Sequence, residues 1–252
     1  MEEPKRKSFL DNLKEQLSLI NRSTLTTRFL YIGEYKGSKN NLRKKMNLNV
    51  TELNEEYGEI VLTGFLLVYP KYFLHLIEAS EEIIYRHLQA IFAADFQEIL
   101  GHVISLPTSY NIYKLYFSDW HYAFAANPPV LLSKIEQIEL HEIHKQIKNC
   151  LFKMYSLSEY LMDVGNKSRN SFVEIIKNLE TNASDYLPEV TIIEYLLSIE
   201  TSVLKDLRDY LKAFNDFPTI NFYNDCIWPP PSSFAPRVIN YFDETQKQVD
   251  QL

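Results

Sequence analysis

Hydrophobic and polar residues alternate in short stretches along the first half of the chain, which is typical of β-strands. The expected strands cover residues 28–35, 60–69, 72–78, 99–106 and 117–125. The stretch 60–69 is almost continuously apolar, which predicts a central strand covered on both faces. Pro70 and Lys71 separate it from the next strand, so the two are expected to form a hairpin.

Three other stretches have apolar residues at helical spacing. Residues 9–20 predict a short amphipathic leader helix, and residues 50–58 predict a second helix. A third helix is expected from Ser80 to about residue 94, because a hydroxyl cap is followed by Glu81 and Glu82 in the first turn. Its apolar face is formed by Ile83, Ile84, His87, Leu88, Ile91 and Phe92.

The resulting order, β-α-β-β-α-β-β, predicts an α+β fold of the ferredoxin-like kind, with both helices on one face of a single sheet. We expect residues 28–126 to form this domain, after a leader helix within residues 1–27. Its buried residues are expected to include Phe65, Leu67, Phe73, Leu76 and Ile91.

Beyond Pro128 and Pro129 the hydrophobic period changes from two residues to about three and a half. Residues 127–216 are therefore expected to form a helical region without strands, with helices over 131–163, 171–179 and 188–214. The tail, 217–252, combines aromatic residues with a proline run in FPTINFYNDCIWPPPSSF. Such a segment either wraps its own domain in extended form or inserts into a groove of a partner.

The net charge and the number of cysteines limit the classes of protein to which the chain can belong. The formal net charge of -7 argues against a nucleic-acid binder, which needs a clustered basic surface. Only two cysteines occur, so we expect a reducing, intracellular compartment. The apolar runs are too short to cross a membrane.

One segment is basic, although the chain as a whole is acidic. KGSKNNLRKK, residues 36–45, carries five basic residues and no acid, and its Gly, Ser and Asn content predicts a loop. Two interpretations remain open for it. It is a solvated loop, or Lys39, Arg43, Lys44 and Lys45 dock on an acidic protein surface such as that of a microtubule.

Catalytic and metal-binding motifs are not found in the sequence. There is no P-loop, no GxSxG element and no dinucleotide-binding glycine pattern. His141 and His144 are three residues apart, whereas zinc proteases place two histidines four apart around a glutamate base. We therefore expect neither an enzyme nor a metal site.

Two motifs resemble those of BLUF domains, the flavin-binding blue-light sensors. LTGFLLVYPKYFLHLIEAS, residues 62–80, is similar to the LTG and FxQxLEG signature, and FSDWHYAF, residues 117–124, is similar to their FxxWxM motif. Tyr31 on the first predicted strand matches the BLUF tyrosine. The resemblance implies the BLUF fold and, in that family, a flavin held between two helices.

The same resemblance assigns the positions of the flavin pocket, several of which are altered. Tyr31 matches the tyrosine that gives an electron and a proton to the excited flavin, and Trp120 matches the tryptophan of the last strand. His75 stands at the switching glutamine, Tyr57 at the asparagine that holds the ring edge, and Tyr122 at the methionine. Imidazole has no amide to switch, and tyrosine is larger than asparagine, so the pocket is expected to be converted.

Two functions compete at this stage. In the first, His75 is a core-edge histidine hydrogen-bonded to Tyr31 or Tyr57, no cofactor is bound, and the chain is a structural or regulatory interaction protein. In the second, FAD is retained and the chain is a blue-light photoreceptor with an altered pocket. The resemblance extends to an animal BLUF-like protein of sperm, which implies the flagellum and axonemal or microtubule-associated protein partners.

Overall fold

The computed structural model describes residues 8–19, 24–58, 61–93, 99–132, 135, 138–199, 201 and 203–215. Helix α1, Phe9–Leu19, confirms the expected leader helix. The proline-containing tail, 217–252, lies outside the described residues.

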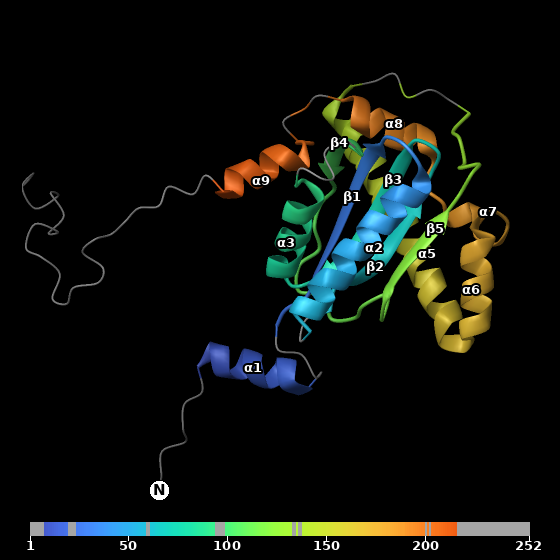
Figure 1. The fold of residues 1–252 in the computed structure, drawn as a ribbon. Helices are drawn as coiled ribbons and strands as arrows, with labels where there is room; N and C mark the ends of the chain where they lie inside the picture. Colours follow the sequence, from blue (N-terminus) through green and yellow to red (C-terminus); the bar gives the residue numbers. More distant parts are fainter. Residues whose placement is uncertain are drawn as a thin grey trace, which may run out of the picture. The chain divides into compact units, whose positions relative to one another are not determined.

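A single sheet of five strands forms the centre of the fold (Figure 1). The strands are β1 (Thr27–Tyr35), β2 (Thr63–Val68), β3 (Tyr72–Ala79), β4 (Leu100–Ser105) and β5 (Trp120–Phe124). Their spatial order is β4-β1-β3-β2-β5; the first four are antiparallel to their neighbours, and β5 lies parallel to β2. The order of β4, β1, β3 and β2 is that of a ferredoxin-like domain, so the expected fold class is confirmed.

Helices α2, Lys39–Glu56, and α3, Glu81–Ile91, lie on one face of the sheet (Figure 1). The expected helix over 50–58 is present as the C-terminal part of α2, but the prediction of a loop over residues 36–45 was wrong, because the helix already begins at Lys39. Ser38 caps α2 by accepting a hydrogen bond from the Asn41 N–H, which satisfies a donor of the first turn. Leu42 and Met46 then continue the buried stripe toward the N-terminus of the helix.

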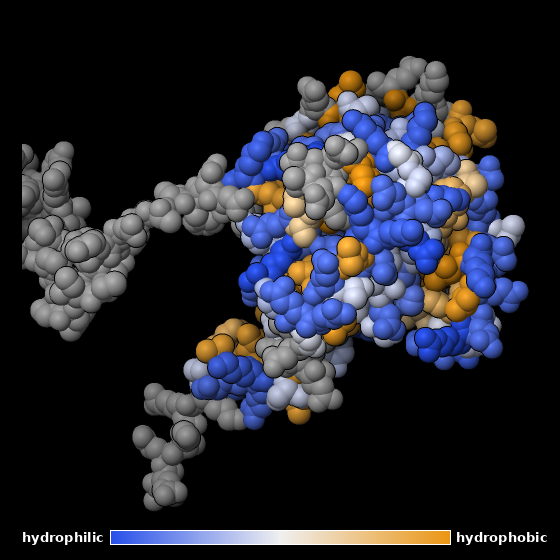
Figure 2. All heavy atoms as spheres, in the orientation of Figure 1, coloured by the Kyte–Doolittle hydropathy of each residue, from blue (hydrophilic) through white to orange (hydrophobic). Residues whose placement is uncertain are grey.

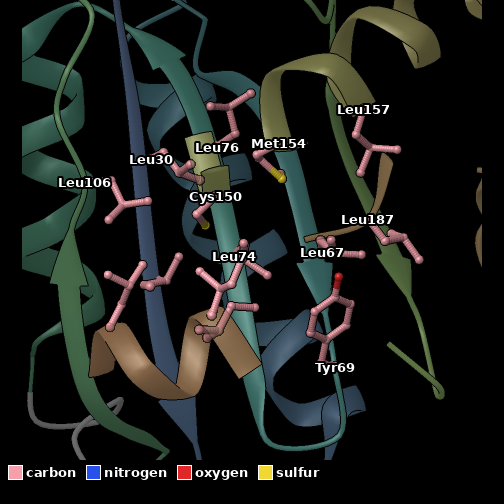
Figure 3. Close-up of a cluster of buried hydrophobic side chains, with 14 of the residues drawn as sticks. Leu30, Leu67, Tyr69, Leu74, Leu76, Leu106, Cys150, Met154, Leu157 and Leu187 are labelled. Atoms are coloured by element: carbon pink, nitrogen blue, oxygen red, sulfur yellow. The ribbon is translucent and has the colours of Figure 1, made fainter. Parts of the chain in front are cut away.

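The opposite face packs against helices from the second half of the chain. Cys150, Met154 and Leu157 of α5 (Leu140–Lys167) approach leucines of β1, β2 and β3 (Figure 3). The Tyr69 hydroxyl, at the end of β2, donates a hydrogen bond to the Pro188 carbonyl over 2.7 Å. The sheet is thus buried on both faces, as the apolar stretch 60–69 predicted, and the five expected core residues are all fully buried.

The helical region differs from the prediction in its boundaries. Its elements are α5, α6 (Arg169–Lys177), α7 (Leu179–Asn182), the short 3-10 helix η1 (Ser184–Tyr186), α8 (Val190–Ser198) and α9 (Leu207–Asn215). Helix α5 begins at Leu140 and not near residue 131, and Ser168 separates it from α6, whose Ser171 N–H it caps.

The single helix expected over 188–214 is in fact two. Asp206 begins α9 by accepting hydrogen bonds from the backbone N–H groups of Arg208, Asp209 and Tyr210, and it also forms an isolated β-bridge with Ile104. Both interactions require the chain to leave α8 before residue 206. Apart from this bridge, the described part of residues 135–215 contains no strand residues, in agreement with the prediction.

Gly64 of the LTG stretch is required by a close approach between β2 and β3. Its φ is +151°, and a Cβ atom there would lie 2.1 Å from the Leu76 carbonyl oxygen. Any larger residue would push the two central strands apart.

The molecular surface over α2 and α3 is mostly hydrophilic, with scattered apolar side chains (Figure 2). Within the described residues, none of the helices combines the length and the apolar character needed to span a bilayer.

Candidate functional site

Tyr31 and His75 meet on the face of the sheet that α2 and α3 cover. They are paired in the register of β1 and β3, and Tyr31 Oη lies 2.6 Å from His75 Nδ1. Both side chains are fully buried. The structure thus brings these two predicted residues together, and His75 has the tyrosine partner that the sequence suggested.

The contact belongs to a longer row of hydrogen bonds between side chains. At one end, Trp120 Nε1–H on β5 donates to His75 Nε2 over 2.8 Å. Beyond Tyr31, its hydroxyl lies 2.8 Å from His87 Nε2 on α3, and His87 Nδ1 is hydrogen-bonded to Asn49 Oδ1 on α2. We call Trp120, His75, Tyr31, His87 and Asn49 the buried polar chain.

The two ends of the buried polar chain fix the direction of every bond within it. Indole can only donate, so His75 Nε2 is an acceptor and its proton is on Nδ1, which donates to Tyr31 Oη. The Tyr31 hydroxyl then donates to His87 Nε2. His87 carries its proton on Nδ1 and donates to the amide oxygen of Asn49, which can only accept.

Burial keeps the rings of the chain uncharged. The pKa of His75 is lowered well below its ordinary value, first by burial and second by the neighbouring His87. Burial lowers the pKa of His87 to about 3 and raises the pKa of Tyr31 well above its ordinary value. Neutral imidazoles, each with one donor and one acceptor nitrogen, are what a one-directional chain requires.

No buried side-chain nitrogen or oxygen among the described residues lacks a hydrogen-bond partner. Met46 Sδ lies 4.0 Å from Tyr31 Oη, so α2 also contributes an apolar contact at the centre of the chain. The donors on this face are therefore already used within the protein.

Tyr57 and Tyr122, the other two predicted pocket residues, are not part of the chain. Tyr57 is the C-terminal cap residue of α2, where its ring lies 4.7 Å from the Arg86 guanidinium. Tyr122 is half-buried on β5, with the Arg43 guanidinium 5.1 Å from its ring. Of the two tyrosines that the sequence offered as partners of His75, the structure has Tyr31 in contact with it and not Tyr57, and Trp120 is its second partner.

The predicted basic residues lie on α2 and not in a loop. Lys39 is in its first turn, and its Nζ lies 3.3 Å from the centre of the Phe124 ring on β5. Arg43 and Lys44 are exposed one turn later, and Lys45 is half-buried. The helix thereby holds Lys39 and Arg43 beside β5.

Sequence reasoning missed the roles of Asn49 and His87. The spacing of the motifs directed attention to Tyr57, eight residues after Asn49, and His87 was read only as part of an apolar stripe. A usable signal was present, because Leu42, Met46, Asn49 and Leu53 recur at helical spacing and place an amide on the buried face of α2.

His141 and His144 are exposed on α5. The described residues contain no group of three or more His, Cys, Asp or Glu side chains placed to hold a metal ion.

A family model, described as testis-expressed protein 47, matches residues 25–216. The match includes the whole sheet and its covering helices. The chain belongs to the testis-expressed protein 47 family. The BLUF-like family to which the sequence resemblance pointed is thereby confirmed.

Solved structures with a similar chain path include BLUF proteins. One titled "BlrP1 BLUF" is 16% identical, with a TM-score of 0.31 over 39% of this chain and 64% of that chain. A bacterial light-regulated adenylyl cyclase is 17% identical, with a TM-score of 0.34 over 54% of this chain and 37% of the other. The BLUF protein BlrB in its dark state is 11% identical, with a TM-score of 0.32 over 68% of this chain and 97% of the other. The chain thus spans less than two thirds of the first two structures.

Proposed function

We propose that this member of the testis-expressed protein 47 family is a non-enzymatic interaction protein, built on a BLUF-like domain that does not use flavin photochemistry. The observation that carries the proposal is the hydrogen bond between His87 and Asn49. It joins α3 to α2 over Tyr31, at the place where BLUF proteins hold the flavin between their two helices.

A flavin entering this slot would have to break the buried polar chain. Separating His87 from Asn49 leaves a buried donor and a buried acceptor without partners, at about 1–3 kcal/mol each. The flavin edge would regain some of these bonds, but it would also displace Met46, which is fully buried against Tyr31. Binding is therefore expected to be weak or absent.

Light signalling also requires a switch, and the position of the BLUF glutamine offers none. His75 is held from both sides, by Trp120 on one nitrogen and Tyr31 on the other. Turning the ring over would bring Cδ2 and Cε1 to these contacts in place of the two nitrogens, so both hydrogen bonds would be lost. The domain is accordingly a rigid scaffold at this position.

The family name and the charge distribution support a proposal for the setting. The family model is described as testis-expressed, which supports a location inside sperm cells, in the cytoplasm or the flagellum. Its partners are proteins, for which axonemal and microtubule-associated components are the candidates. Lys39, Arg43, Lys44 and Lys45 on α2 are the residues we assign to partner binding.

The experiment is spectroscopic. The full chain is expressed with excess riboflavin, purified, and examined for flavin absorption at about 450 nm before and after blue light. We expect no flavin band, and no quenching of free FMN or FAD fluorescence on titration. A band that shifts to the red under light would contradict the proposal and establish the photoreceptor alternative. A band without a shift would indicate a flavoprotein that does not signal.

A further inference from the structure

The two edge strands of the sheet, β4 and β5, differ in whether other parts of the chain bind their outward backbone groups. At the β4 edge, Arg208 Nη1 donates to the Gly101 carbonyl over 2.9 Å, and its Nη2 donates to the Leu100 carbonyl over 3.1 Å. Asp206 adds the bridge to Ile104. These contacts occupy backbone groups that an edge strand would otherwise present to another chain.

At the β5 edge, α6 packs against the strand through Phe172 and His121, but no described residue makes such backbone contacts. The Asp119 carbonyl accepts from Gly64, and the Ala125 N–H donates to Val68, so the odd-numbered residues of this strand face β2. Backbone groups of successive strand residues point to opposite sides. Those of Trp120, Tyr122 and Phe124 therefore point outward, and none of them has a hydrogen-bond partner in the part of the chain that the structure describes.

Basic side chains lie along this open edge on the α2 side. Lys39 lies over the Phe124 ring and Arg43 near the Tyr122 ring, so two cations border the strand. In Figure 1, β5 lies at one margin of the sheet, with α2 on the face nearest the viewer. A segment added to β5 would pass close to both cations.

A hollow next to these cations has the donors that carboxylates require. It has a volume of about 470 Å³, and its described lining residues, none of them acidic, are Asn40, Arg43, Lys44 and Asn47. Neither Arg43 nor Lys44 forms an ion pair with a described acidic residue. A local excess of cations is notable in a chain of net charge -7, and it selects for an acidic ligand.

We propose that the outer edge of β5 is a docking site for an extended segment of a protein partner with acidic side chains at alternate positions. The segment adds a strand to the sheet through the outward backbone groups of Trp120, Tyr122 and Phe124. Its carboxylates on one face meet Arg43 and Lys44. The inference rests on the interaction role proposed above and gives it a surface and a class of partner.

The probe is a fluorescein-labelled peptide in which glutamate and valine alternate, titrated with the full chain at low ionic strength and followed by fluorescence anisotropy. Added salt should weaken binding, because part of the attraction is between charges. The same peptide with lysine in place of glutamate should not bind. A peptide whose backbone nitrogens are methylated at alternate residues, on the edge facing β5, should also lose binding, since it cannot donate to the strand.

Two pairs of variants locate the site. Tyr122→Pro removes an outward N–H while leaving the bonds to β2 in place, and it should weaken binding roughly tenfold or more relative to Tyr122→Ala. Arg43→Glu combined with Lys44→Glu should weaken binding at least as much. Lys148→Glu, an exposed change on α5, should leave it unchanged.

Equal binding of the methylated and unmethylated peptides would overturn strand addition, even where Tyr122→Pro fails to fold. The proposal of an acidic partner would be overturned if the double variant of Arg43 and Lys44 bound the peptide as tightly as the unaltered chain. It would also be overturned if the unaltered chain did not bind the acidic peptide. Each of these results would overturn the docking site and leave the proposed function standing. The proposed function is tested by the flavin spectrum, which does not depend on the β5 edge.

Discussion

His87 on α3 and Asn49 on α2 are hydrogen-bonded to each other beneath the surface of the helical layer, and both side chains are buried. The bond closes the space between the two helices and also terminates a chain that begins on the far strand, at Trp120. Three elements of the sheet and two helices are thereby joined through side chains alone. Single substitutions that break these hydrogen bonds should therefore lower the free energy of unfolding of the domain.

The hydroxyl of Tyr31 is the central link. Tyr31→Phe leaves the Nδ1–H of His75 without an acceptor and Nε2 of His87 without a donor. Two buried unpaired groups should lower the free energy of unfolding by about 2–5 kcal/mol, measured by urea denaturation. The exposed Tyr113→Phe is the matched control and should cost almost nothing. An equal and small effect of both changes would show that the chain contributes little.

Acid should destabilise the fold through the two buried histidines. His87 has a folded pKa of about 3, below the ordinary value of 6.5, so the unfolded chain binds a proton that the folded chain does not between these values. The free energy of unfolding should fall as the pH drops below about 6.5, by up to about 1.4 kcal/mol per pH unit for each histidine.

The histidine contribution can be separated by comparing the unaltered chain with His87→Gln in urea denaturation over a pH series. The variant should show a shallower loss of stability on acidification. Glu78 acts in the opposite direction, because burial raises its pKa above the ordinary value of 4.5, so just above that pH the folded chain holds a proton that the unfolded chain has released. Parallel pH profiles for the two proteins would rule out a role for His87.

The ion pair between Arg28 and Glu78 attaches the segment before β5 to the sheet. Arg28 Nε donates to Glu78 Oε1 over 2.7 Å, while Oε2 accepts from the backbone of Tyr116 and Phe117. Arg28→Met should destabilise the protein by about 3–5 kcal/mol, because it leaves a buried carboxylate without its partner.

The double variant Arg28→Met with Glu78→Gln removes that charge and should recover part of the loss, as measured by thermal and urea unfolding. If the double variant is as unstable as the sum of the single changes, the charge pairing is not the cause.

The sequence was sufficient to predict the sheet and helix α3, and it offered Tyr31 as one of two hydrogen-bond partners of His75. Period-two stretches and the capped start at Ser80 are local signals, and the structure agrees with them closely. The N-terminal half of α2 was not predicted, because Lys and Asn dominate KGSKNNLRKK and only Leu42 and Met46 reveal the buried face of the helix there.

The contact between Asn49 and His87 could not be predicted because it is non-local. Asn49 and His87 are separated by 38 residues, and their contact depends on how α2 and α3 cross the sheet. The boundary between α8 and α9 is similar, since the bridge between Asp206 and Ile104 decides it. Local periodicity contains no information about either contact.

Reopening the slot should be possible by removing the bond between the helices. The triple variant Asn49→Ala, His87→Ala and His75→Gln frees space beside Tyr31 and restores an amide on β3, so it should bind FMN or FAD more tightly than the unaltered chain. Tyr57→Asn should have no such effect, because Tyr57 lies outside the buried polar chain. Fluorescence titration with free flavin measures both, and a gain from Tyr57→Asn alone would contradict this placement.

The measurement that tests the buried polar chain most directly is long-range ¹H–¹⁵N NMR of the full chain labelled at histidine, with His75→Gln and His87→Gln used to assign the signals. At neutral pH we predict that both rings are uncharged and that each carries its proton on Nδ1, as the donor at Trp120 and the acceptor at Asn49 require. A charged ring at either position, or a proton on Nε2 of either one, would contradict the account.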